Sequence, residues 1–427
     1  MLMPLLRTLS LRRVPGLGSM YGGVDVIDGT TAFFGGIPYA EAPVGPLRWM
    51  PPQPHKGWGE QPRNATWFRE FCLQPNQPAN APMAEDCLFL NVGTPLDALK
   101  SGGKKLPVML WSTASPTAVV LRAALTRSGA WQSTAAPTRR ARPTTTTATP
   151  WSPPPRSRSS SSPSTVSCSR SSRLIKLVAL TPPLPLRADR LNVFGFLGSS
   201  EVAARTKGGG AGNFGIQDQR AAIAWTKAHI GAFGGDGDDI TIFGESAGGN
   251  SVINHLAQPA SFGLYTKAII ESGAYDLGAE PMASAQASYA KLLTAAKCSN
   301  LDCLVAKTPL EVGTANEAGA GAGGGPVVDG VSLTDTPVGL IEKKTYNNKV
   351  PVIIGSNRDE AAFFTLLEQT PQNMTDADFD AAMIAGGMKP VSRKPTAAGC
   401  SLEREVSAAI LDLSPPPPHL PVVRFLN

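Results

Sequence analysis

The sequence predicts an α/β fold in which helices flank a central, mostly parallel sheet. Two short apolar runs, residues 106–111 and 350–355, lack polar alternation, as expected of strands buried on both faces of such a sheet. A third run, residues 240–243, leads directly into a serine bracketed by glycines and then into an apolar stretch at 251–257. Strand, sharp turn and helix in immediate succession are typical of a sheet covered by helices.

Length and composition agree with a large globular protein. The chain has 427 residues, 42% hydrophobic and 17% charged, which allows two or three domains or one α/β domain with long excursions. No apolar run approaches the roughly 20 residues that a membrane-spanning helix needs, so we expect no membrane span. Residues 1–19 carry Arg7, Arg12 and Arg13 but no acidic residue. A targeting peptide and a disordered N-terminus are the two interpretations of this stretch.

Positive charge is concentrated in residues 112–188. This segment holds ten arginines and Lys176 but no aspartate or glutamate, and removing these eleven cations from the net charge of +6 leaves −5. Such a polar, single-signed segment buries little apolar surface, so we expect it to be disordered or poorly packed, with a strand only near 174–180. A basic tether for nucleic acid is the alternative, but the segment contains no recognisable binding fold, and we predict no nucleic-acid partner. The composition changes again in the proline-rich tail, residues 389–427.

Cysteines and glycosylation triplets indicate an oxidising compartment. The pairs Cys72–Cys87 and Cys298–Cys303 are each close in sequence, so two local disulfides are the simplest interpretation, and six reduced thiols are the alternative. The acceptor triplet for N-glycosylation occurs at Asn64 and at Asn373. We therefore predict a secreted glycoprotein or a resident of the secretory pathway.

The candidate nucleophile is Ser246, in Gly244-Glu245-Ser246-Ala247-Gly248. A Gly-x-Ser-x-Gly pentapeptide between a strand and a helix needs small residues, because the serine occupies a strained turn that larger side chains would block. That turn presents the hydroxyl above the sheet edge, where the following helix offers free N–H groups to a developing oxyanion. The Ala247 N–H is the predicted oxyanion donor.

Several further blocks occur in order with this pentapeptide, and together they resemble the type-B carboxylesterase family of α/β hydrolases. The family includes carboxylesterases, cholinesterases and related lipases. The resemblance spans roughly residues 20–111 and 190–385 and is highly specific because independent blocks agree. The matching blocks are residues 34–48, 85–92, 213–215, 218–219, 233–236 and 243–249.

The resemblance implies an α/β-hydrolase domain over residues 20–388, incomplete where 112–188 interrupts it. It implies that Cys72–Cys87 and Cys298–Cys303 are the two disulfide loops of the family. It also implies that Glu360 is the acidic member of a Ser-acid-His triad, in agreement with a carboxylate that follows a strand late in the chain. Asp359 is the neighbouring alternative.

Two family features are missing. An oxyanion loop His-Gly-Gly-Gly would begin near Ser112, but the chain reads Ser112-Thr113-Ala114-Ser115-Pro116. None of the four histidines has the sequence context of the triad base, so the base is unknown. His55, His229 and His255 are interpreted as structural or surface residues. His419 follows Glu360 in the required order but lies in the proline-rich tail, which makes it a weak candidate.

Three hypotheses cover these observations. The first is a carboxylic ester hydrolase that forms an acyl-enzyme at Ser246 on a small-molecule ester, inactive if the oxyanion loop and the base are truly missing. The second is a non-catalytic binding or adhesion module on the same fold. Under the third hypothesis, residues 112–188 and the tail are translated from out-of-frame or intronic sequence.

No cofactor and no metal site are expected, since no His and Cys cluster has ligand spacing. The oligomeric state is left open.

Overall fold

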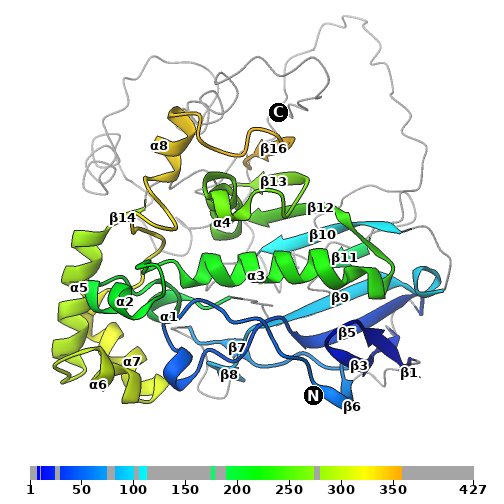
Figure 1. The fold of residues 1–427 in the computed structure, drawn as a ribbon, viewed down its shortest axis with the longest axis horizontal. Helices are drawn as coiled ribbons and strands as arrows, with labels where there is room; N and C mark the ends of the chain where they lie inside the picture. Colours follow the sequence, from blue (N-terminus) through cyan, green and yellow to red (C-terminus); the bar gives the residue numbers. More distant parts are fainter. Residues whose placement is uncertain are drawn as a thin grey trace, which may run out of the picture.

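A sheet of nine described strands forms the centre of the protein (Figure 1). The computed structural model describes residues 7–9, 11–24, 29–74, 82–100, 105–112, 175–177, 189–273 and 279–357. In spatial order the strands are β1 (Arg7–Thr8), β4 (Gly23–Val24), β5 (Thr31–Pro38), β9 (Phe89–Pro95), β11 (Ile175–Leu177), β10 (Leu106–Ser112), β12 (Gly235–Glu245), β13 (Lys267–Glu271) and β16 (Val352–Gly355).

The sheet has two parts. From β1 to β11 neighbouring strands are antiparallel, whereas β10 runs parallel to both β11 and β12, and β13 runs parallel to β12 and β16. The parallel part agrees with the predicted α/β-hydrolase sheet. Parallel strands end at a common edge, so β10, β12, β13 and β16 all present their carboxyl ends there.

Helices cover this sheet and form a second layer at one end of it. Figure 1 shows α3 across the sheet and α5 to α7 grouped at one end. The helices are α1 (Asn192–Phe196), α2 (Ser200–Arg205), α3 (Phe214–His229), α4 (Ala247–Ala257), α5 (Met282–Ala295), α6 (Leu301–Ala306), α7 (Pro309–Ala315) and α8 (Pro337–Glu342). In the minor sheets, β3 (Gly18–Tyr21) pairs with both β2 (Arg12–Val14) and β6 (Gly59–Asn64). The strand β7 (Phe71–Cys72) pairs with β8 (Met83–Ala84), and β14 (Glu280–Pro281) pairs with β15 (Val327–Val328).

Two apolar clusters correspond to these layers. The larger lies between the sheet and the helices α3 and α4, where Ile223, Trp225 and Val252 are buried. The smaller cluster connects helix α1 with helix α5, and in it Trp49 and Tyr289 are 0% and 1% exposed. The indole N–H of Trp49 donates to the carbonyl of Val193 at 2.8 Å, which satisfies a polar group that would otherwise be costly to bury.

Some predicted elements differ in detail from those observed. Strands do form at 106–111 and, within the run 350–355, at 352–355. Among the β10 side chains that the structure describes, only Val108 is fully buried, and in β16 Ile353 is 37% exposed. β16 is the last strand in the described order, so one side of it lacks a described neighbour. Within residues 1–19, Val14 is fully buried and Leu17 is 9% exposed. Residues 11–19 thus contribute side chains to the described core.

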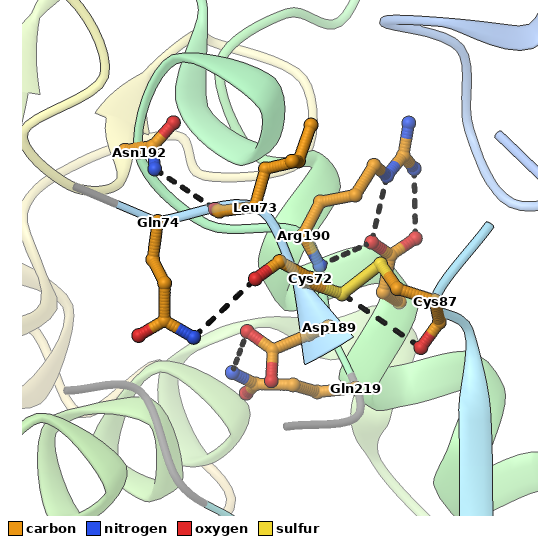
Figure 2. Close-up of a disulfide and its surroundings, with 9 residues drawn as sticks. Cys72, Leu73, Gln74, Cys87, Asp189, Arg190, Asn192 and Gln219 are labelled. Atoms are coloured by element: carbon orange, nitrogen blue, oxygen red, sulfur yellow. Dashed lines mark hydrogen bonds and ion pairs between the residues drawn. A yellow bond between two sulfur atoms is a disulfide. The ribbon is translucent and has the colours of Figure 1, made fainter. Parts of the chain in front are cut away.

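Both expected disulfides, Cys72–Cys87 and Cys298–Cys303, are present. Figure 2 shows Cys72–Cys87 beside residues 189–192, where the described chain resumes. Here the Asn192 amide donates to the Leu73 carbonyl at 3.0 Å. The Arg190 guanidinium forms two hydrogen bonds of 2.7 Å with the buried Asp218 carboxylate. The Asn192–Leu73 hydrogen bond attaches this part of the chain to the N-terminal disulfide loop, and the Arg190–Asp218 pair ties it to α3.

Candidate active site

Ser246 occupies a strained turn between β12 and α4. Its backbone φ is 57° and ψ is −123°, a region that a residue with a side chain rarely adopts. Two hydrogen bonds hold it there: the Ser246 N–H donates to the Glu271 carbonyl at 2.8 Å, and the Asn250 N–H donates to the Ser246 carbonyl at 2.9 Å. Strain of this kind costs on the order of 1–3 kcal/mol and persists only where the surroundings impose it.

A contact between two glycines brings α4 close to the sheet. A Cβ on Gly273 would lie 2.4 Å from the carbonyl carbon of Gly249, and a Cβ on Gly249 would lie 2.8 Å from the Cα of Gly273. The first turn of α4 therefore rests directly on the backbone that follows β13. Gly249 belongs to the block of residues around Ser246 that the sequence pattern indicates, whereas no sequence pattern indicates Gly273, because its role depends on a contact between segments distant in the chain.

The expected oxyanion region adjoins the turn at Ser246 between β12 and α4, which we call the elbow. Ser112, the last residue of β10, is paired in register with Gly244 of β12. The chain that follows Ser112 lies outside the described residues. Ala247 is the first residue of α4, so its N–H has no partner within the helix and points out of the helix N-terminus.

β16, the strand that precedes the predicted triad carboxylate Glu360, ends at the same edge of the sheet as β12. Gly355 of β16 is paired with Glu271 of β13, and Glu271 is paired with Glu245 of β12. Two strand spacings, about 10 Å, therefore separate the ends of β12 and β16. Glu360 and its alternative Asp359 lie outside the described residues, as does His419.

The three described histidines have structural environments. His255 is 1% exposed, and its Nδ1 and Nε2 atoms lie 2.9 Å from Ser261 Oγ and 3.1 Å from Gln219 Oε1. Burial, with a smaller contribution from the nearby Arg220 cation, lowers the pKa of His255 to about 3. Burial also lowers the pKa values of His55 and His229. The ring of His229 packs on Trp225, with the ring centroids 5.1 Å apart.

The described residues contain neither a candidate metal site nor a candidate membrane-spanning helix. Within them, no group of three or more His, Cys, Asp or Glu side chains is placed to hold a metal ion. In the same part of the chain, no helix is both long and apolar enough to cross a membrane.

Comparison with known proteins gives consistent matches. A model of the carboxylesterase family matches residues 14–114 and 189–396. The acylcarnitine hydrolase of Mus musculus is 33% identical over 365 residues, covering 80% of this chain and 54% of that protein. The cocaine esterase of Oryctolagus cuniculus is 30% identical, with 84% of this chain and 61% of that protein covered. This chain thus spans little more than half the length of these relatives.

Solved structures give the same answer for the fold. A carboxylesterase of Geobacillus stearothermophilus superposes with a TM-score of 0.63 and 28% sequence identity, covering 89% of this chain and 69% of that one. A structure described as a PNB esterase superposes with a TM-score of 0.62 and 25% identity, covering 94% of this chain and 74% of that one. Since the family match covers well over half of its residues, the chain has the α/β-hydrolase fold and belongs to the carboxylesterase family.

Proposed function

We propose that the protein hydrolyses carboxylic esters through an acyl-enzyme formed on Ser246. The observation that carries the proposal is the backbone of Ser246, which is held at φ 57° between a parallel strand and a helix N-terminus. A binding module has no need to maintain this strain, whereas a nucleophile gains exposure of its hydroxyl from it.

The roles of the other residues follow from the chemistry. The Ser246 hydroxyl attacks the ester carbonyl, and the Ala247 N–H, at the positive end of α4, stabilises the oxyanion. Glu360 would orient the base that accepts the serine proton. His419 is the first residue to test as that base. Cleavage of the ester C–O bond then expels the alcohol, which takes its proton from the base, and leaves the acyl group on Ser246. Water attacks this acyl-enzyme, releases the acid and restores the Ser246 hydroxyl.

Hydrolysis of p-nitrophenyl butyrate by the wild-type chain and by Ser246→Ala tests this proposal. Ser284→Ala is the matched control, because Ser284 is exposed on α5 and bonds only Glu280 among the described contacts. We expect turnover by the wild type and the control and none by Ser246→Ala. Equal turnover by all three would refute the role of Ser246. Wild-type inactivity would favour the non-catalytic binding module, unless a protein made from the re-sequenced transcript restores turnover.

We also propose passage through the secretory pathway. The two disulfides and the exposed side chain of Asn64, at the end of β6, support it. Expression in a secreting eukaryotic cell should give a glycan that an endoglycosidase removes. Loss of the glycan in Asn64→Gln would assign it to this site, and an unglycosylated wild type would contradict the proposal.

A further inference from the structure

Gln219 of α3 lies at the centre of a buried hydrogen-bond network beneath the nucleophile helix. Its side-chain Nε2 donates to Ser251 Oγ and to Asp189 Oδ2, each at 3.1 Å. Gln219, Ser251 and Asp189 are 6%, 3% and 1% exposed. Figure 2 shows the Gln219 amide directed at the Asp189 carboxylate. Both amide hydrogens therefore have buried acceptors.

The network reaches both ends of α4. At the first turn, the Ser251 hydroxyl that accepts from Gln219 donates to the carbonyl of Ala247 at 3.0 Å. At the last turn, Gln219 Oε1 lies 3.1 Å from His255 Nε2. Since the amide nitrogen of Gln219 is already committed to two acceptors, its oxygen faces His255, and the ring carries its proton on Nε2. His255 Nδ1 then accepts from the Ser261 hydroxyl at 2.9 Å.

We propose that Gln219 is a positioning residue for the nucleophile, fixing α4 through Ser251 and His255 and anchoring both to Asp189. The inference rests on the proposed function, in which Ser246 and Ala247 immediately precede and begin this helix. Gln219 touches no reacting atom. It acts by holding the helix whose first N–H stabilises the oxyanion, and misplacement of a catalytic group by about 1 Å can cost on the order of a hundredfold in rate.

The isosteric variant Gln219→Glu tests whether Gln219 positions α4 through its hydrogen bonds or only fills space in the core. A carboxylate at this position cannot donate to Ser251 or Asp189, and its charge faces that of Asp189. The other titratable groups of the described network are His255, Arg220, Arg190, Asp218 and Tyr39. Two adjacent carboxylates share one proton at low pH. The shared proton restores a donor between positions 219 and 189.

The measurement is kcat per reactive site for p-nitrophenyl butyrate, with sites counted by fluorophosphonate labelling, at about pH 8 and about pH 5.5. For Gln219→Glu we expect kcat to fall on the order of ten- to a hundredfold at the higher pH. Much of the loss should be recovered at the lower pH relative to wild type, with KM changed less than about twofold. Gln219→Leu, of similar size, should show the loss without recovery. Gln286→Glu is the matched control, since Gln286 accepts from the Ser200 N–H, as a carboxylate also can.

Several outcomes would overturn the inference. A kcat for Gln219→Glu within about twofold of wild type at both pH values would do so, as would the same relative loss at both. If the wild type neither hydrolyses nor labels, the proposed function fails for this chain, and amide hydrogen exchange over residues 247–251 decides the role of Gln219. Positioning requires faster exchange in Gln219→Glu than in wild type at the higher pH and a smaller difference at the lower pH. Equal exchange refutes it.

Discussion

Replacing Gly273 by alanine should displace the nucleophile helix without altering any catalytic group. An ideal Cβ on Gly273 would lie 2.4 Å from the carbonyl carbon of Gly249, 2.5 Å from its Cα and 2.7 Å from the amide nitrogen of Asn250. All three are backbone atoms, which cannot rotate aside as a side chain can. Since carbon atoms in contact lie about 3.5 Å or more apart, the two segments must separate by about 1 Å.

The expected effects follow from this separation. Overpacking of this size costs about 1–3 kcal/mol in the free energy of unfolding. Gly249 lies three residues after Ser246, so the shift moves the elbow as well. A displacement of about 1 Å at a catalytic group lowers the rate on the order of a hundredfold. Thermal unfolding and hydrolysis of p-nitrophenyl butyrate measure the two effects separately.

Gly313→Ala is the matched control. Gly313 lies inside α7, and a Cβ there would meet no atom within 4 Å. Alanine favours a helix by up to about 1 kcal/mol over glycine, so the control should unfold at the same or a higher temperature. If Gly273→Ala matched Gly313→Ala in both melting temperature and rate, the contact between α4 and the segment after β13 could not be what fixes the elbow.

Two further predictions concern buried ionisable groups. The free energy of unfolding should decrease as pH falls from about 6.5 towards 3, because only unfolded His255 can take up a proton. In urea titrations the loss between about pH 7.5 and 5 should be smaller in His255→Gln, by about 2 kcal/mol; equal losses would contradict this. Glu85→Ala should cost about 3–5 kcal/mol, because the buried Arg48 guanidinium loses its carboxylate partner. By contrast, Asp238→Ala, in the exposed pair with Lys227, should cost at most about 1 kcal/mol. Similar melting temperatures for these two variants would refute the difference.

The elbow could be predicted from sequence because its determinants are contiguous. β12, Ser246 and α4 follow one another directly, and glycines at 244 and 248 indicate the tight turn between them. The aspartates and glycine at 236–239 coincide with an irregularity in β12, where the pairing with β10 jumps from Gly235 to Ile240. Local residue preferences were sufficient for these features.

Features that depend on tertiary contacts could not be read in this way. Gly273 looks like any loop glycine until β13 is paired with β12, and Gln219 is one of several polar residues on α3 until α4 is packed against it. An apolar run such as 350–355 likewise predicts a strand but not its neighbours, so the exposure of Ile353 was missed. The roles of Glu360 and His419 stay predictions.

The contacts of Arg48 have a consequence for synthesis on the ribosome. Its guanidinium donates to the carbonyls of Leu304, Val305 and Lys307, 256 to 259 residues later in the chain. At about 5–20 residues per second, those acceptors are made roughly 10 to 50 seconds after Arg48. Until then the Arg48 guanidinium lacks these three acceptors, although Glu85 and the Cys72–Cys87 bridge are available early. The nascent chain must therefore stay soluble for tens of seconds before its domain can close.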